Sequence, residues 1–194
     1  MTKIIGLTGG IGSGKTTIAQ YFKSLDIPVY IADEEAKKLL DNPIIQDRIK
    51  VVFGETIIEK DKVSREKLAS IVFQNPQKLS ALNAIIHPAV KEHFQNWLTQ
   101  HQNNPIVIKE AAILFESGSY QDCDKIITVV APLETRIERV IARDKTTKDD
   151  VLNRIKNQWA DEMRIAKSDF IIDNNDLSSA KLQVDKILKK LTNP

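Results

Sequence analysis

Eight residues near the start of the chain restrict its fold more than any other stretch. They read Gly9-Gly10-Ile11-Gly12-Ser13-Gly14-Lys15-Thr16 and fit G-x-x-x-x-G-K-[ST], the pattern of a phosphate-binding loop. The apolar run 3–8 before the loop predicts a buried strand, and residues 18–25 after it have the apolar spacing of a helix. This order of strand, glycine loop and helix is the context that the motif requires.

The residue types of the loop suit a nucleoside triphosphate. Glycine adopts positive φ easily and leaves no side chain between the backbone and a ligand. Backbone N–H groups then point inward, and the start of the helix adds a partial positive charge. Lys15 is placed to reach the β- and γ-phosphates, and the Thr16 hydroxyl to bind a Mg²⁺ ion that bridges them. The alternative, a turn that only connects strand to helix, needs neither a lysine nor a threonine at these offsets.

Composition limits the other functions open to the chain. With 194 residues it is long enough for one compact α/β unit with insertions, rather than two independent domains. A net charge of +2, from charges of both signs, argues against extended nucleic-acid or membrane-surface binding. Cys123 is the only cysteine, which excludes an internal disulfide and a cysteine metal cluster. The sequence has no signal-peptide pattern and no membrane-spanning apolar run, so we expect a reducing, cytoplasmic setting.

Four more apolar runs predict strands, at residues 27–32, 105–109, 125–130 and 168–172. Helical patterns between them predict an α/β class: a P-loop NTPase three-layer fold with a five-stranded, mainly parallel sheet. We expect a single domain with its core in residues 1–33, 105–142 and 168–194. Residues of about 34–104 would form a helical acceptor-binding insertion, and residues of about 143–167 a lid. In the insertion, Pro76 and Pro88 each predict the start of a separate helix.

Acidic residues follow two of the predicted strands. Asp33 comes directly after the second strand, at the sheet edge where α/β proteins bind ligands, but Asp is also a favoured helix N-cap. The residues alone leave both interpretations open, and both can hold together. Glu110 and Glu116 follow the third strand, where an acidic side chain often helps to hold Mg²⁺ through water. For Glu116 we favour a surface turn instead.

Four basic or titratable side chains are further candidates. Arg65 opens a predicted helix of the insertion and His87 precedes a proline, although such residues are usually a solvated charge and a local cap. Arg139 and Arg143 are four residues apart and share one face of a predicted helix. They lead into the polar stretch 144–150, a candidate mobile lid, where arginines suit the charge of a transferred phosphoryl group. The alternative for both arginines is a solvated helix face.

In combination, these motifs resemble the dephospho-CoA kinase family, a group of P-loop enzymes similar to the nucleoside-monophosphate kinases. The resemblance runs along nearly the whole chain. It rests on residues 7–16, Ala32-Asp33, Arg65, His87-Pro88, Leu114-Phe115-Glu116, the arginine-bearing helix and Asp173-Asn174. The chain departs from the family pattern at Ile31, where the family usually has Asp, and at Ala112, where it usually has Pro.

The resemblance implies transfer of the ATP γ-phosphate to the ribose 3′-hydroxyl of dephospho-CoA, the last step of coenzyme A synthesis. ATP and Mg²⁺ would be the cofactors. The loop residues implied to hold the ATP phosphates are Gly9, Gly10, Gly12, Ser13, Gly14, Lys15, Thr16 and Thr17, with Thr16 as the metal ligand. The implied catalytic residues are Asp33, which would orient the hydroxyl and accept its proton, and Lys15, Arg139 and Arg143, which would neutralise charge.

The same resemblance implies the remaining contacts. Arg65, His87, Leu114 and Phe115 look like acceptor-binding residues, and Asn174 and Asn175 resemble the segment that lines the adenine of ATP. The implied partner is the small-molecule substrate dephospho-CoA, with no nucleic acid and no membrane. We expect a monomer or a weak homo-oligomer.

Three other functions compete with this one. A kinase of the same architecture could act on a nucleoside monophosphate, shikimate or gluconate, and would differ only in its acceptor. A GTP-dependent switch protein needs a guanine-reading Asn-Lys-x-Asp, which does not occur in the chain. A nucleotide-binding module that docks a protein through residues 41–104 would not turn over ATP when only small acceptors are supplied.

Overall fold

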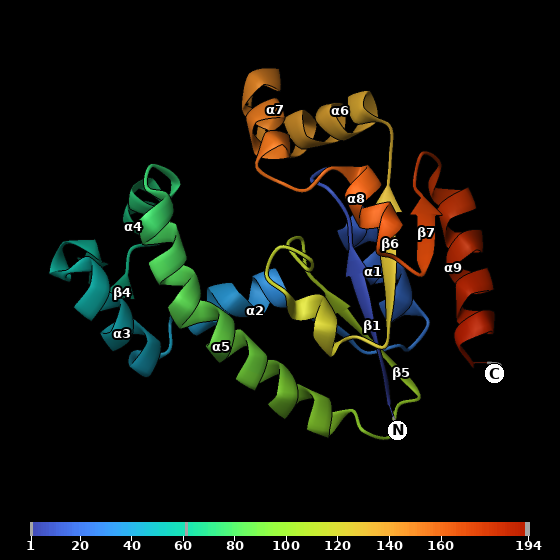
Figure 1. Ribbon diagram of the computed structural model, residues 1–194, viewed down its shortest axis with the longest axis horizontal. Coiled ribbons are helices and arrows are strands. Elements are labelled where there is room, and N and C mark those ends of the chain that lie inside the picture. The colour runs from blue at the N-terminus through green and yellow to red at the C-terminus, as the bar shows by residue number, and fades with distance from the viewer. Residues whose placement is uncertain (1, 61, 193–194) are drawn as a thin grey trace. The chain divides into compact units, whose positions relative to one another are not determined.

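The computed structural model describes residues 2–60 and 62–192. The chain divides into two compact units. The core unit comprises Met1–Ile31 and His101–Pro194, and the helical unit comprises Ala32–Gln100. Figure 1 labels most of their helices and strands, numbered in chain order.

The core unit is built on a five-stranded sheet in the order β2-β5-β1-β6-β7, with all neighbouring strands parallel. The strands are β1 (Lys3–Thr8), β2 (Val29–Ile31), β5 (Ile106–Glu110), β6 (Lys125–Val130) and β7 (Phe170–Asp173). The predicted α/β class and five-stranded parallel sheet are therefore confirmed. Strand β1 lies at the centre, so the glycine loop leaves the middle of the carboxyl edge, where α/β sheets bind ligands.

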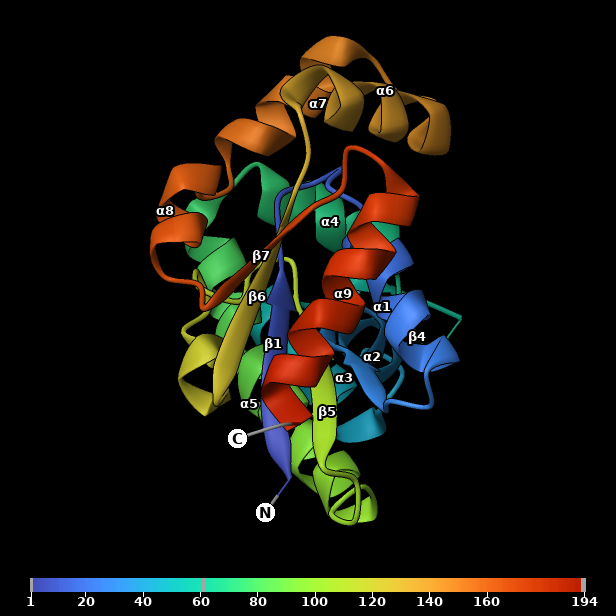
Figure 2. The ribbon, with the colours of Figure 1, turned by 90° about the vertical axis from the view of Figure 1, so that its right-hand side faces the viewer.

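One face of the sheet is covered by two helices, α1 (Lys15–Ser24) and α9 (Leu177–Thr192). Alternate residues of the strands point to this face, because side chains in a strand alternate between its two sides. They form one buried apolar core with both helices. The helices contact each other and lie side by side (Figures 1 and 2). The core members from the central strands include Ile5, Leu7, Ile108, Ile127 and Val129.

The other face of β1 carries the segment after β5, which includes the short 3₁₀ helix η2 (Ser119–Asp122). A Cβ atom at Gly6 would lie 2.8 Å from Leu114 Cδ2 and 3.0 Å from Cys123 Sγ. Glycine at this position therefore lets the segment pack directly on the strand. Helix α8 (Asp161–Ala166), which the sequence did not predict, contacts β6.

Helices α6 (Leu133–Asp144) and α7 (Lys148–Lys156) pack together as a hairpin around a small apolar core. The sequence predicts an exposed turn over residues 144–150 and a helix that resumes at Val151 and continues through Gln158 and Trp159. The helix instead begins at Lys148, because Thr147 and Asp150 form a reciprocal capping box at its N-terminus. It ends at Lys156, so the two residues predicted to continue it, Gln158 and Trp159, lie beyond its end.

The helical unit has an apolar core of its own, formed by residues such as Ile49, Phe53 and Leu68. Its helices are α2 (Ala32–Leu39), α3 (Pro43–Phe53), α4 (Arg65–Phe73) and α5 (Pro76–Gln100), with the 3₁₀ helix η1 (Glu55–Ile57). A small antiparallel pair, β3 (Ile58–Glu59) and β4 (Lys62–Val63), was not predicted, because two residues per strand give no measurable alternation.

Helix α5 corrects the prediction of two separate helices starting at Pro76 and Pro88. It is one helix of 25 residues with Pro88 inside it. A proline in a helix removes a hydrogen bond and crowds the preceding turn. Here α5 packs against α2, α3 and α4 along its length, and these tertiary contacts outweigh the local preference for a break.

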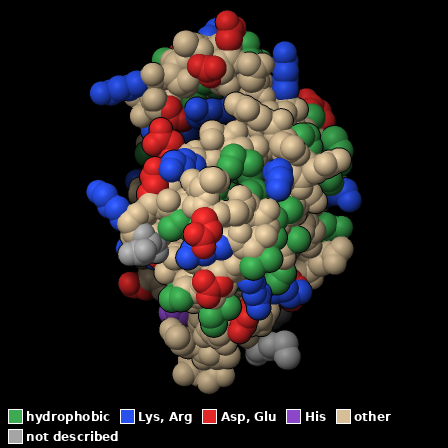
Figure 3. Space-filling view, turned by 90° about the vertical axis from the view of Figure 1, so that its left-hand side faces the viewer, with side chains coloured by type: hydrophobic (Ala, Val, Ile, Leu, Met, Phe, Trp, Pro, Cys, Tyr) green, Lys and Arg blue, Asp and Glu red, His purple; other side chains and the backbone are tan. Residues whose placement is uncertain are grey.

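The surface carries charges of both signs. On the face drawn in Figure 3, Lys and Arg side chains are interspersed with Asp and Glu side chains. Among the helices that the structure describes, none is both long enough and apolar enough to cross a membrane.

Candidate active site

The glycine loop joins β1 to α1 and makes a tight backbone turn. Gly12 and Gly14 have φ of 78° and 91°, in the left-handed region that favours glycine. The Ser13 N–H donates to the Gly10 carbonyl at 3.1 Å and closes the turn. The first half of the motif thus folds into a tight arch, as the predicted phosphate-binding loop requires.

The start of helix α1 suits an anion. Its N-cap is Gly14, which has no side chain to accept from the free N–H groups of the first turn. The first turn contains Lys15, Thr16 and Thr17, with no acidic residue, and both threonines are exposed. The N–H groups and the helix dipole therefore point at a position where no side-chain carboxylate of the first turn competes with a phosphate.

Asn174 ties the turn after β7 to the loop. It is 3% exposed, and its side-chain amide donates to the Ser13 carbonyl at 2.8 Å. Its own carbonyl accepts from Arg139 Nη2 at 2.9 Å. The neighbouring Asn175 is exposed. The structure thus brings Asn174 to the phosphate loop itself, and adenine contact by either asparagine stays a prediction.

Arg139 is the predicted lid arginine that the structure brings to the loop. Its Nη1 atom is buried and makes no hydrogen bond, and it would lie 3.7 Å from a Cβ atom on Gly14. A buried, charged donor without a partner is costly unless a ligand satisfies it. The geometry therefore points Arg139 at the anion that the loop would hold.

Arg143 is placed differently, although it shares the helix with Arg139. Its guanidinium donates to both carboxylate oxygens of Asp144, at 2.7 and 3.1 Å, and its side chain is 62% exposed. Asp144 also accepts from Arg154 at 2.7 Å. Bonds to these two arginines lower the pKa of Asp144 to about 2. A role for Arg143 on the phosphates stays a prediction, and it requires the side chain to leave Asp144.

Arg136 is a site residue that the sequence analysis missed. It is 5% exposed, and its Nε donates to the Ile11 carbonyl in the loop at 2.9 Å. Its Nη1 donates to Asp161 at 2.7 Å. A signal was available: Arg136 interrupts the apolar stripe of α6 and lies three residues before Arg139, so both can face the same element.

Glu116 also differs from its predicted role, because it is not a free residue of a surface turn. One carboxylate oxygen accepts from the Trp159 N–H and from Arg164 Nη2, both at 3.1 Å. The other oxygen is buried without a partner. The adjacent acceptor candidates Leu114 and Phe115 are buried, and the Phe115 ring stacks on Trp159 at 5.6 Å between centroids.

The loop region fits the phosphates of ATP. Four buried polar atoms around it lack hydrogen-bond partners: Thr8 Oγ1, Ser13 Oγ, Asn174 Oδ1 and Arg139 Nη1. Mg²⁺ fits as well, because this ion keeps several waters and usually takes only one or two protein oxygens besides the phosphates. Within residues 2–60 and 62–192 no group of three or more His, Cys, Asp or Glu could hold a metal. Thr16 as the metal ligand stays a prediction from the motif.

Comparison with known proteins decides the family. A sequence model described as dephospho-CoA kinase matches residues 3–179. The chain belongs to the dephospho-CoA kinase family. The dephospho-CoA kinase of Bacteroides fragilis (strain YCH46) is 39% identical over 172 residues, which cover 88% of this chain and 84% of that protein.

Solved structures agree with this membership. The crystal structure of TT1252 from Thermus thermophilus has a TM-score of 0.90 and 30% identity, and the match covers 100% of this chain and 99% of the TT1252 chain. The dephospho-CoA kinase from Campylobacter jejuni has a TM-score of 0.73 and 27% identity, and covers 99% and 98%. The P-loop kinase fold predicted from the sequence is therefore confirmed.

The remaining residues that the dephospho-CoA kinase resemblance selects lie in the helical unit. Asp33 is the second residue of α2, so it is not the N-cap of that helix, which was one of the two interpretations left open, and its side chain is exposed. Arg65 Nη2 donates to the Lys37 carbonyl at 2.8 Å and to Asp41 at 3.0 Å. His87 is half-buried within α5, and burial lowers its pKa. Their contact with an acceptor stays a prediction.

Proposed function

We propose that the chain transfers the γ-phosphate of ATP to the ribose 3′-hydroxyl of dephospho-CoA, giving coenzyme A and ADP. The observation that carries this proposal is the match of the dephospho-CoA kinase family model to residues 3–179, in a chain whose glycine loop is shaped for phosphates. The reaction would be the last step of coenzyme A synthesis.

In this proposal the chain acts by positioning and charge neutralisation, as is general for phosphoryl transfer. Loop N–H groups and Lys15 hold the phosphates. Arg139 supplies positive charge through its buried Nη1 atom, which has no hydrogen-bond partner within the protein. The Thr16 hydroxyl would hold Mg²⁺, which would supply further charge neutralisation when bound. Arg143 adds its charge after it leaves Asp144.

Asp33 is the proposed general base. Its carboxylate accepts the proton of the 3′-hydroxyl, while that oxygen forms a bond to the γ-phosphorus and the bond to the β,γ-bridging oxygen breaks. Its exposed side chain and its position two residues after β2 support this role, because the carboxyl ends of parallel strands are where such sheets bind ligands. We propose that Arg65, His87, Leu114 and Phe115 hold the acceptor, and that residues 32–100 serve mainly for that purpose.

The test is a coupled assay of ADP release with ATP and Mg²⁺, in the presence and absence of dephospho-CoA, together with mass detection of the product. We expect ADP release that depends on dephospho-CoA and a mass gain of one phosphate on the acceptor. Nucleoside monophosphates, shikimate and gluconate serve as rival acceptors. If one of these supports turnover and dephospho-CoA does not, the proposal is wrong. If no small acceptor does, a protein partner has to be sought instead.

A further inference from the structure

The tip of the glycine loop is held by residues far along the chain. The Ile11 N–H donates to Gln158 Oε1 at 2.8 Å, and its carbonyl accepts from Arg136 Nε at 2.9 Å. Its side chain packs against the apolar core of the α6–α7 hairpin, which contains Ile137 and Val140. Both backbone groups and the side chain of Ile11 are therefore fixed from outside the loop.

Arg136 is in turn fixed by a chain of alternating charges, Arg136–Asp161–Arg164–Glu116, which we call the clasp. Its two arginines are buried and its two carboxylates are partly buried. Arg136 Nη1 donates to one oxygen of Asp161 at 2.7 Å, and Arg164 Nη1 donates to the other at 3.1 Å. Arg164 is fully buried, and its Nη2 donates to Glu116 at 3.1 Å. Two positive and two negative charges balance along the clasp.

Glu116 and Arg164 also fix the backbone next to Gln158. The Trp159 N–H donates to Glu116 Oε1 at 3.1 Å, and the Trp159 carbonyl accepts from Arg164 Nη1 at 2.6 Å. The Trp159 ring lies parallel to that of Phe115, with an interplanar angle of 3°. Glu116 therefore reaches Ile11 by two routes: through the clasp to its carbonyl, and through Trp159 and Gln158 to its N–H.

Stability alone does not explain such a cluster. Buried ion pairs lose so much hydration that apolar side chains of similar volume often stabilise a fold equally well or better. The charges instead fix the orientation of the side chains, because each carboxylate oxygen selects one orientation of the next guanidinium. The clasp begins at residue 116, directly after the acceptor candidates Leu114 and Phe115, and ends at the loop that would hold ATP.

We propose that Glu116 is a positioning residue, which sets the tip of the phosphate-binding loop through Arg164, Asp161 and Arg136. This deepens the proposed function, since it rests on the loop as the ATP site. It links the segment next to the acceptor to the geometry of the transferred phosphate. Glu116 acts through other residues and does not itself contact the reacting atoms.

The test is a double-mutant cycle on nucleotide affinity. Glu116→Gln, Arg136→Lys and the double variant are titrated with Mg²⁺ and a non-hydrolysable ATP analogue by calorimetry. We expect each single change to weaken binding by about tenfold, since small misplacements of binding groups have effects of this order or larger. Glu116 and Arg136 share no bond, so independent effects would multiply to about 100-fold. The clasp predicts a double variant within about twofold of the weaker single variant, and a multiplicative result overturns it.

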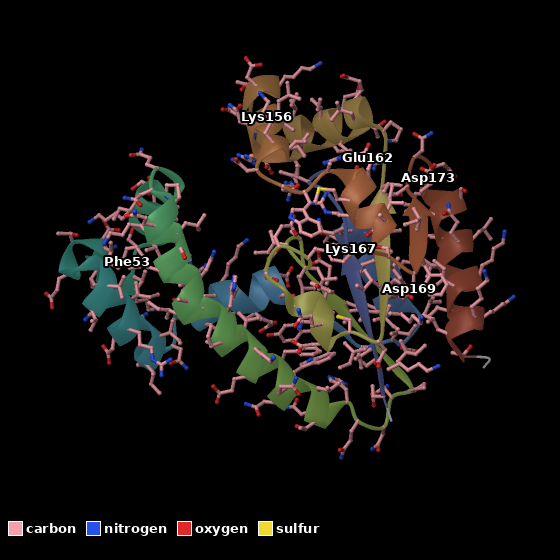
Figure 4. The ribbon with its side chains drawn as sticks, viewed as in Figure 1. Phe53, Lys156, Glu162, Lys167, Asp169 and Asp173 are labelled. Atoms are coloured by element: carbon pink, nitrogen blue, oxygen red, sulfur yellow. The ribbon has the colours of Figure 1, made fainter. Side chains whose placement is uncertain are left out.

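Glu162→Gln is the matched control, because it makes the same chemical change on an exposed side chain of α8 (Figure 4). We expect it to bind the analogue like wild type. If Glu116→Gln also binds like wild type and only lowers the melting temperature, Glu116 is merely structural and the proposal is wrong. Gln158→Ala covers the case in which a clasp variant does not fold. It removes the hydrogen bond that holds the Ile11 N–H, which is worth about twofold to tenfold in affinity. An unchanged affinity would show that the supports of the loop tip do not set nucleotide binding, and would overturn the proposal.

These measurements need no acceptor, so the two proposals fail separately. Wild-type protein that binds the analogue but does not phosphorylate dephospho-CoA would refute the proposed function and leave the clasp intact. Multiplicative effects in an enzyme that does phosphorylate dephospho-CoA would refute the clasp alone.

Discussion

Replacing Asn174 by aspartate tests whether a residue outside the motif supports the phosphate loop. The side-chain amide of Asn174 donates to the Ser13 carbonyl at 2.8 Å and is almost fully buried. Aspartate has nearly the same shape. Its ionised carboxylate has no proton to donate and would place an oxygen against the Ser13 carbonyl oxygen. Asn174→Asp therefore changes one hydrogen bond and one charge while it preserves packing.

The structure sets the size of the effect. Loss of the donor leaves the Ser13 carbonyl without this bond, which costs about 1–3 kcal/mol for a buried group. Because about 1.4 kcal/mol is a factor of ten in binding, we expect an ATP analogue to bind about 10- to 100-fold more weakly if the loop relaxes. The new negative charge lies next to the phosphate site and weakens binding further. Arg139, which donates to the Asn174 carbonyl, would screen part of that charge.

The effect should depend on pH in a known direction. Burial disfavours the charged form, so the new carboxyl has a pKa raised above its ordinary value of about 3.9. Below that raised pKa the carboxyl is neutral and can again donate to the Ser13 carbonyl. Both the affinity and the stability of Asn174→Asp should therefore recover as the pH falls, and be lost as it rises through the raised pKa.

The assay is calorimetric titration of a non-hydrolysable ATP analogue with Mg²⁺ between pH 5.5 and 8, with urea unfolding alongside. Asn103→Asp is the control, since it adds the same charge at an exposed residue before β5, at the opposite edge of the parallel sheet. We expect the control to bind like wild type. An affinity of Asn174→Asp within about twofold of the control at every pH would refute the reasoning.

Three further predictions concern single residues. Asp33→Asn should lower turnover by a factor of about 10²–10⁴ while the affinity for an ATP analogue stays near that of wild type. Steady-state kinetics and calorimetry measure the two effects, and unchanged turnover would show that Asp33 is not the base. Arg139→Ala should lower turnover by a larger factor than it weakens acceptor binding, because the buried Nη1 atom of Arg139 faces the loop. Kinetics equal to those of wild type would show that Arg139 has no part in the transfer. Burial raises the pKa of Cys123 from 9.0 to about 11, so at pH 8 its thiolate fraction is about 100-fold lower than in the unfolded chain. Iodoacetamide labelling followed by mass spectrometry should therefore be slow until urea unfolds the protein, and rapid labelling of the folded protein would contradict the burial.

The sequence was sufficient for the parts of the structure that local pattern controls. Apolar runs locate all five strands of the main sheet, and the glycine motif locates the loop and the start of α1. The capping box of Thr147 and Asp150 is also a local pattern, and it indicates the start of α7 at Lys148. Propensity failed at Pro88, where packing of α5 against three other helices overrides the local preference.

The supporting residues of the site were not predictable in the same way. Asn174 lies 161 residues from the carbonyl that it holds, and Arg136 lies 125 residues from Ile11. No local sequence pattern indicates such a contact, because the contact depends on how β6, β7 and α6 return to the end of β1. Glu116 shows the consequence. An acidic residue in a loop predicts a surface turn, and only the structure shows the buried Arg164 beside it.

Two glycines of the loop are required by the distant side chains that support it. Gly14 needs glycine for its positive φ, but a Cβ atom there would also strike the amide of Asn174. Gly10 is the more informative case, because its φ is not positive and the general motif allows any residue at its position. A Cβ atom on Gly10 would strike the guanidinium of Arg136. The glycine is therefore explained by the room that Arg136 needs, and the particular loop of this chain is shaped by the arginine that holds its tip.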